Sequence, residues 1–154
     1  MRILLDNNAI DKMSNHLSFI KNHTEIEFFI CREVVGEVCQ NKFYNPTMNI
    51  SSLLKAGVKY LPNTGFIIGH SLLDGESTLS SDLQNKVYYN ILNKTKSNIS
   101  DAIIASTAHS YNCILLTYDK KLYKKMKKFN YQVTTFEELE KGISYHIKSG
   151  TITS

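Results

Sequence analysis

Two acidic residues follow two short apolar runs that lie far apart in the chain. Asp6 comes directly after "RILL", and Asp119 comes two residues after "CILLT". Runs of this kind are typical of strands that are buried on both faces of a parallel sheet. The carboxyl ends of parallel strands meet at one edge, where open α/β sheets bind their ligands. We therefore expect both carboxylates at that edge.

Two further acids are candidates for the same site. Asp101 opens the segment that leads into the second apolar run, and Glu37 lies in the helical pattern of "REVVGEVCQ", one turn after Glu33. Gathered carboxylates raise each other's pKa, and a hard divalent cation with oxygen ligands relieves that repulsion. Mg²⁺ or Mn²⁺ in such a site activates water and neutralises charge on a phosphate. Apolar neighbours favour Glu37, but the choice between it and Glu33 stays open.

Strand and helix patterns alternate along the chain, which predicts a three-layer α/β/α sandwich with a mainly parallel sheet. The strand patterns are 2–5, 26–30, 58–61, 113–117 and 131–135. The helical patterns are 10–20, 32–40, a segment from the Pro46 turn to Gly57, 79–92, 102–111, 120–129 and 136–147. Ser100 and Asp101 are expected to form the N-cap and first turn of the helix over 102–111.

The composition predicts one globular domain over residues 1–154. The hydrophobic share of 42% and the charged share of 21% are those of ordinary globular proteins. No apolar run is long enough to cross a bilayer and no secretory signal is recognisable, so we expect a cytoplasmic protein with no membrane partner. The three cysteines, Cys31, Cys39 and Cys113, are expected to be reduced thiols.

The net charge of +4 permits a polyanionic partner but does not require one. The segment "DKKLYKKMKKF" holds six of the 18 basic residues and begins at Asp119. It is either a solvated helix face or a patch that contacts phosphates beside the acidic edge. The candidate nucleic-acid contacts are Lys120, Lys121, Lys124, Lys125 and Lys128. Tyr118 is a candidate for stacking on single-stranded bases.

The ordered set of "ILLDNNAI", the Glu37 segment, "SDAIIASTA" and "CILLTYDKKL" resembles the PIN-domain nucleases. The resemblance covers nearly the whole chain and is closest to small single-domain PIN ribonucleases such as VapC-type toxins. It implies an acidic quartet that binds Mg²⁺ or Mn²⁺, formed by Asp6, Glu37, Asp101 and Asp119. It also implies that Asn8 steadies the first acid and that Thr117 supports the fourth. The family often has Thr where this chain has Asn7.

The resemblance implies a metal-dependent endoribonuclease that leaves a 5′-phosphate and a 3′-hydroxyl. RNA is the implied substrate, and an antitoxin protein and a second copy of the chain are possible partners. The segment from Asn63 to Lys96 matches no specific feature, so the surfaces facing substrate and partner stay open. The RNA target, the number of metal ions and a role as a toxin also stay open.

Simpler interpretations exist for each acid. Asp6 could be a turn residue, and both Asp101 and Asp119 could stabilise helix starts. The main rival function is a non-catalytic PIN-like module that binds nucleic acid or a protein through its basic face. A phosphotransfer site like that of response-regulator receivers would need a lysine at the end of a late strand. The segment "YQVTT" offers none.

Overall fold

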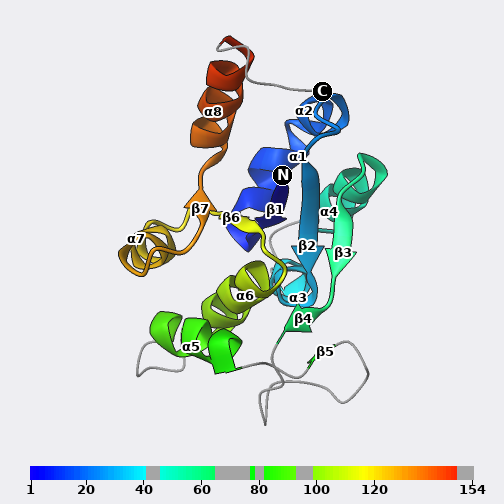
Figure 1. The fold of residues 1–154 in the computed structure, drawn as a ribbon. Coiled ribbons are helices and arrows are strands. Elements are labelled where there is room, and N and C mark those ends of the chain that lie inside the picture. The colour runs from blue at the N-terminus through cyan, green and yellow to red at the C-terminus, as the bar shows by residue number, and fades with distance from the viewer. Residues whose placement is uncertain (41–45, 65–76, 79–81, 93–98, 149–154) are drawn as a thin grey trace.

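Five strands form a parallel sheet in the order β3-β2-β1-β6-β7 (Figure 1). The computed structural model describes residues 1–40, 46–64, 77–78, 82–92 and 99–148, without the side chains of 46–47, 63–64, 77–78, 82–85 and 144–148. The strands of this sheet are β1 (Arg2–Leu5), β2 (Glu27–Cys31), β3 (Lys59–Leu61), β6 (Ile114–Leu116) and β7 (Val133–Thr134). All four pairings are parallel, which confirms the predicted sheet type.

Strand β1 lies at the centre of the sheet because its apolar side chains are covered on both faces. Its residues Ile3, Leu4 and Leu5 are fully buried. The register places Leu5 opposite Leu116 of β6. The next residue of β1 and the next residue of β6 therefore reach the carboxyl edge of the sheet side by side.

Helices connect the strands and cover the sheet. Their bounds are η1 (Asn7–Ala9), α1 (Ile10–Ser14), α2 (Leu17–Asn22), α3 (Arg32–Gln40), α4 (Pro46–Lys55), α5 (Asp82–Ile91), α6 (Ile99–Ser110), α7 (Lys120–Lys128) and α8 (Phe136–Lys148). Strands β4 (Asn63–Thr64) and β5 (Ser77–Thr78) pair separately, in parallel. Parallel crossovers are right-handed, so the helices between β1 and β3 cover one face, and those leading to β6 and β7 cover the other.

Helix α6 packs small residues against the core of the protein. Ala102, Ala105 and Ala108 are fully buried, which lets the helix approach the sheet closely. It contacts α3 (Figure 1), and Ser100 in its first turn donates a hydrogen bond to Glu33 of α3. Helix α6 thus runs past the sheet and brings its N-terminal turn to the same edge as the end of β1.

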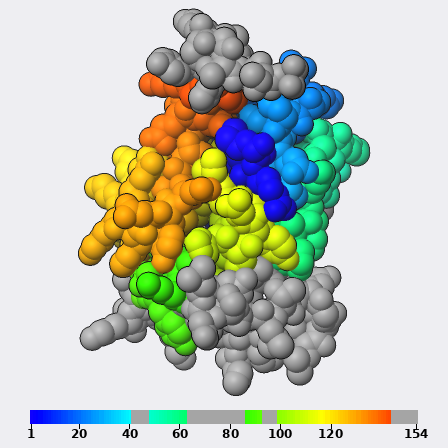
Figure 2. Space-filling model, viewed as in Figure 1, coloured from blue at the N-terminus to red at the C-terminus, as the bar shows by residue number. Residues whose placement is uncertain are grey.

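The first residues of the chain lie on the surface at the opposite edge. Figure 2 shows them in dark blue beside the yellow-green residues at the end of α6. The guanidinium of Arg2 donates to the carbonyl of Tyr111 at 2.6 Å, which joins the start of β1 to the end of α6. In the described part of the chain, no helix is long and apolar enough to cross a membrane.

Two details of the helices differ from the sequence expectations. The helical pattern over 10–20 is interrupted at Asn15 and His16, which separate α1 from α2. Helix α6 begins at Ile99, so Ser100 lies inside the first turn and the prediction that it is the N-cap is wrong. Cys31 and Cys113 are buried and Cys39 is exposed, and all three are free thiols as expected. Of the predicted helix over 79–92, residues 79–81 lie outside the described residues.

Candidate active site

Asp6 is the first polar residue after β1, and only 4% of its surface is exposed. Its backbone N–H donates to the carbonyl of Leu116 at 3.0 Å, which fixes it beside the end of β6. Its Oδ1 accepts a hydrogen bond at 2.7 Å from the backbone N–H of Asn7 and so caps η1. The apolar strand therefore holds a carboxylate, shielded from most water, at the carboxyl edge of the sheet.

The environment of Asp6 disfavours its ionised form. Burial raises the pKa of Asp6 to about 6, hydrogen bonds from Thr117 and Asn7 lower it, and the charges of Asp101 and Asp119 raise it. The net effect shows that burial and neighbouring negative charge outweigh the two hydrogen bonds. A nearby cation would reverse that balance.

Thr117 joins the first acid to the fourth. Its side chain is fully buried. Its hydroxyl donates to Oδ2 of Asp6 at 2.5 Å and accepts from the backbone N–H of Asp119 at 3.0 Å. One hydroxyl thereby sets the position of both acids, whereas the sequence had suggested support for Asp119 alone.

Asn8 also contacts Thr117 and the start of the loop that follows β6. Its Oδ1 accepts a hydrogen bond from the backbone N–H of Tyr118 at 2.8 Å and lies 3.4 Å from the hydroxyl oxygen of Thr117. No hydrogen bond between Asn8 and Asp6 is found among the described residues. Asn8 therefore acts on Asp6 through Thr117, by holding the chain just after β6.

Asp119 caps helix α7. Its Oδ1 accepts hydrogen bonds from the backbone N–H groups of Lys121 at 2.6 Å and Leu122 at 2.9 Å. Its negative charge also raises the pKa of both Asp6 and Asp101. The simple interpretation as a helix cap is thus correct, and it does not exclude a place in the acidic cluster.

Asp101 lies in the first turn of α6 and is half-buried. Burial raises its pKa, the charge of Asp119 raises it further, and the ammonium of Lys125 lowers it. The position follows from α6, whose N-terminal turn meets the carboxyl edge of the sheet. The positive end of the helix dipole also favours a carboxylate there.

Glu37 and Glu33 reach the cluster together from α3. The hydroxyl of Ser100 donates to Oε1 of Glu33 at 2.5 Å, and it also lies close enough to Glu37 to lower the pKa of that carboxyl. Burial is the largest effect on Glu37 and raises its pKa, and the charges of Asp6, Glu33 and Asp101 add to the rise. Both glutamates are thus neighbours of the same residues, and the geometry does not separate them.

Ser100 is the residue that the sequence interpretation missed. It links the two glutamates of α3 to the start of α6, where Asp101 follows it. Its only signal in the sequence was the Ser-Asp pair, which fits a helix cap equally well. The link depends on a contact between residues 67 positions apart, which local patterns do not contain.

The lysines of α7 are not equivalent. Lys120, Lys121, Lys124, Lys127 and Lys128 are exposed, as a solvated or phosphate-contacting face requires. Lys125 is half-buried, and its Nζ donates to the carbonyl of Ile91 at the end of α5. Because Lys125 also lowers the pKa of Asp101, it belongs to the border of the acidic cluster rather than to the exposed patch.

Tyr118 is held by the protein itself. Its hydroxyl donates to the carboxylate of Glu137 at 3.0 Å, and that carboxylate also pairs with Lys12 at 3.2 Å. Burial and this carboxylate raise the pKa of Tyr118 to about 12. The partly buried ring packs against the core and links the β6–α7 loop to α8, and its role in stacking on bases stays a prediction.

The donor set at the carboxyl edge consists of carboxylates, with serine and threonine hydroxyls between them. Oxygen donors of this kind suit Mg²⁺ or Mn²⁺ and do not suit a thiolate-bound metal. Among the described residues, no group of three or more His, Cys, Asp or Glu side chains is placed so that it could hold a metal ion. The chemistry of the donors and the raised pKa values of Asp6, Glu37 and Asp101 therefore suit a divalent cation, although the described side chains are not arranged as a site for one.

Comparison with known proteins finds one family match, which lies in the second half of the chain. A family model described as the PIN domain matches residues 74–128. That range contains Asp101, Thr117 and Asp119, but not Asp6 or Glu37. No curated protein sequence matches the chain.

Solved structures share the fold over most of the chain. A PilT N-terminus domain protein from Sulfolobus solfataricus is 19% identical, with a TM-score of 0.54 and 90% of each chain covered. A domain of a functionally unknown protein from Methanocaldococcus jannaschii is 20% identical, with a TM-score of 0.58, covering 88% of this chain and 90% of that chain. VapBC-1 from nontypeable Haemophilus influenzae is 18% identical, with a TM-score of 0.51, covering 88% of this chain and 98% of that chain.

These solved structures agree with the α/β fold of the chain. At identities near one fifth, the structural likeness establishes the fold, and the family match adds the sequence relationship. The chain therefore has the fold of these proteins, and it is similar to the PIN domain over residues 74–128.

Proposed function

We propose that the chain is a metal-dependent endoribonuclease that hydrolyses phosphodiester bonds of RNA. The observation that carries the proposal is the acidic cluster at the carboxyl edge of the sheet. Within it, Asp6, Glu37 and Asp101 all have raised pKa values, and burial is the largest cause in each case. Uncompensated carboxylates of this kind are expected where a divalent cation binds.

The chain's own residues have separable roles in this proposal. Asp6, Asp101 and Glu37 hold the cation, and Asp119 completes its shell directly or through water. When bound, Mg²⁺ or Mn²⁺ supplies an activated water and compensates negative charge on the phosphate. Thr117 positions Asp6 and Asp119 relative to each other through its two hydrogen bonds.

RNA is the proposed substrate because exposed lysines lie next to the cluster. Lys120 and Lys121 directly follow Asp119, and Lys124 and Lys128 continue along α7. Lysines in such a row contact phosphates without reading the base sequence. The family resemblance adds the expectation of products with a 5′-phosphate and a 3′-hydroxyl.

The proposal is tested with purified protein and a fluorescently labelled single-stranded RNA. Cleavage is expected with Mg²⁺ or Mn²⁺, and EDTA is expected to stop it. Products should be degraded by a 5′-phosphate-dependent exonuclease. Cleavage that continues in EDTA, or that Asp6→Asn leaves at the wild-type rate, would contradict the proposal and favour a non-catalytic binding module.

An antitoxin partner is proposed on the resemblance to VapC-type toxins and on the likeness in fold to VapBC-1. Expression of the chain in a bacterial host is expected to arrest growth if the nuclease acts as a toxin in the cytoplasm. Asp6→Asn is expected to relieve the arrest. Equal growth arrest by the wild type and Asp6→Asn would contradict a toxic role for the nuclease site.

A further inference from the structure

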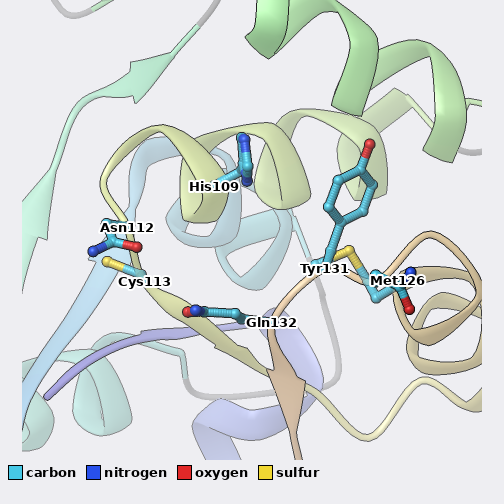
Figure 3. A pocket seen from close by; sticks show the side chains of 7 residues that line it. His109, Asn112, Cys113, Met126, Tyr131 and Gln132 are labelled. Atoms are coloured by element: carbon cyan, nitrogen blue, oxygen red, sulfur yellow. The ribbon is translucent and has the colours of Figure 1, made fainter.

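A groove lies beside the amino ends of β6 and β7, at the end of the sheet opposite to the carboxylates. Its inner part is a cavity of about 180 Å³. Figure 3 shows His109 of α6, Asn112 and Cys113 before β6, and Tyr131 and Gln132 before β7 around this cavity. The strands run from this edge toward the acidic cluster, so the two sites are separated by the length of the sheet.

The outer part of the groove is a larger cavity of about 430 Å³. It shares His109, Asn130 and Tyr131 with the inner part and extends to Lys86 and Asn90 of α5. Small-molecule sites in proteins occupy roughly 300–1,000 Å³. The groove is therefore large enough to take an organic ligand of moderate size.

Tyr131 is the centre of an aromatic cluster in the groove. Its ring centroid lies 5.5 Å from that of His109 and 6.2 Å from that of Phe129. Its hydroxyl accepts a hydrogen bond from Nδ2 of Asn90 at 2.8 Å, which fixes the ring relative to α5. The side chain is only half-buried, so part of it remains accessible to a ligand.

The C-terminal ends of helices α6 and α7 form walls of the groove, and the two ends have the same backbone conformation. Helix α6 is followed by Asn112 at φ 52° and helix α7 by Asn130 at φ 57°, both in the left-handed region. The next residues donate back into the helices, Cys113 N–H to the carbonyl of Ala108 at 2.8 Å and Tyr131 N–H to that of Met126 at 2.9 Å. Both asparagine side chains are exposed, and the backbone holds them at fixed points on the groove wall.

The charge around the groove is positive. Lys86 and Lys128 line its outer part and are exposed. Among the described residues that line either cavity, none is Asp or Glu. The carboxyl ends of two helices disfavour an anion in the inner cavity, whereas the lysines favour one outside it. The complementary ligand has a neutral, flat, polar-edged ring and an anionic group beyond it.

We propose that this groove binds a nucleobase together with its phosphate, supplied by single-stranded RNA or by a free nucleotide. The base stacks against the rings of His109 and Tyr131. Amide side chains at Asn112, Asn130 and Gln132 pair with its polar edge, as amides pair with base edges elsewhere. Lys86 and Lys128 contact the phosphate.

This inference goes beyond the proposed nuclease and does not depend on it. None of the groove residues belongs to the acidic cluster, so base binding needs neither a divalent cation nor cleavage. An Asp6→Asn variant in EDTA therefore keeps the groove intact and leaves RNA uncut. Binding measured under these conditions therefore tests the groove independently of the nuclease activity.

The test uses the four nucleoside 5′-monophosphates and labelled oligouridine and oligoadenosine, each added to Asp6→Asn protein in EDTA. Amide chemical shifts from NMR are expected to change at His109, Tyr131 and their neighbours. Replacing Tyr131 with leucine, which keeps apolar bulk but removes the ring, is expected to weaken binding about fivefold to a hundredfold. Asn130→Gly keeps the backbone conformation and removes the amide, so it is also expected to weaken binding.

Tyr60→Leu is the matched control, because Tyr60 is a 45% exposed tyrosine on β3 at the far edge of the sheet. Circular dichroism checks each variant's folding, and His109→Gln replaces Tyr131→Leu if the latter does not fold. Binding of monophosphates identifies a site for free nucleotides, and binding of oligonucleotides alone identifies a site for an RNA strand. No binding, or affinity unchanged by His109→Gln and Asn130→Gly, would overturn the proposal.

Discussion

Helices α6 and α7 each connect two chemically opposite ends of the molecule. At their N-terminal ends lie carboxylates, Asp101 in the first turn of α6 and Asp119 as the cap of α7. At their C-terminal ends lie neutral amides, Asn112 and Asn130. The helix dipole favours the acids at the positive ends, and it also favours the lysines in the last turn of α7, Lys125, Lys127 and Lys128.

The two ends differ most in how well their polar groups are satisfied. The acidic end gathers charges of one sign, and the pKa values of Asp6, Glu37 and Asp101 are raised. The groove end has capped helices and a tyrosine hydroxyl that accepts from Asn90. The acidic end should therefore respond to cations, pH and removal of charge, and the groove end should respond mainly to backbone changes.

The largest expected effect is the loss of RNA cleavage in Asp101→Asn. Removing a carboxylate that holds the cation should lower the rate by about 1,000-fold or more, since metal contributions reach several kcal/mol. Cleavage of labelled RNA measures the effect, and Glu25→Gln, an exposed acid outside the cluster, is the matched control. Equal rates of RNA cleavage in Asp101→Asn and Glu25→Gln would show that the carboxylate of Asp101 has no special role in cleavage.

The next effect is on stability against pH. The pKa of Asp6 is raised to about 6 in the folded protein, so folding becomes less favourable as Asp6 ionises between about pH 4 and pH 6. The ionised form costs roughly 3 kcal/mol, from about two pKa units at 1.36 kcal/mol each. In EDTA, the free energy of unfolding of Asp6→Asn relative to that of the wild type should therefore increase by about 3 kcal/mol from pH 4 to pH 7.5.

Urea unfolding at both pH values measures this difference in free energy. The asparagine amide can donate to Thr117, whose own proton can turn to Asn8, so the substitution keeps the local contacts. Added Mg²⁺ should then stabilise the wild type at pH 7.5 more than it stabilises Asp6→Asn. If the difference in free energy of unfolding between the wild type and Asp6→Asn is the same at both pH values, burial does not raise the pKa of Asp6.

Thr117→Val should lower the free energy of unfolding by about 2 kcal/mol. The substitution leaves the buried carboxylate of Asp6 and the N–H of Asp119 without the hydroxyl that both contact. RNA cleavage should fall about tenfold to a hundredfold, as for other residues that position metal ligands. Urea unfolding and cleavage rates measure both effects. Thr117→Ser keeps the hydroxyl and should retain most of the activity, and equal losses in both variants would rule out a role for the hydroxyl.

The smallest effect is expected at the groove end. Asn130→Gly should change the free energy of unfolding by less than about 1 kcal/mol, because glycine adopts the φ of 57° without strain. Asn130→Ala should cost about 1–2 kcal/mol through the same backbone conformation. Urea unfolding distinguishes them. Equal costs for the two variants would mean that the side chain, rather than the backbone, stabilises this helix end.

The sequence predicted the parts of the fold that local patterns determine. Strand β1 and helix α3 begin and end at the predicted residues, because an apolar run and an apolar helix face define them. The helix predicted over 10–20 is broken because Ser14 and Asn15 side chains both donate to the carbonyl of Asp11. Such side chains compete with the backbone for helix carbonyls, which apolar spacing does not reveal.

The candidate site was predictable only as far as strand order. The rule for parallel sheets placed Asp6 and the end of β6 at one edge, and the register bears this out. The role of Ser100 beside Glu33, the inward position of Lys125 and the aromatic groove all depend on contacts between distant segments. The patterns of a single sequence contain no signal for such contacts.

The central claim is that the carboxylates at the sheet edge hold a divalent cation, and Mn²⁺ binding tests it most directly. Electron paramagnetic resonance measures free Mn²⁺ during titration of the wild type, Asp6→Asn and Glu25→Gln. Saturable binding is expected in the wild type and Glu25→Gln, and at least tenfold weaker binding is expected in Asp6→Asn. No saturable binding by the wild type, or equal affinity in Asp6→Asn, would contradict it.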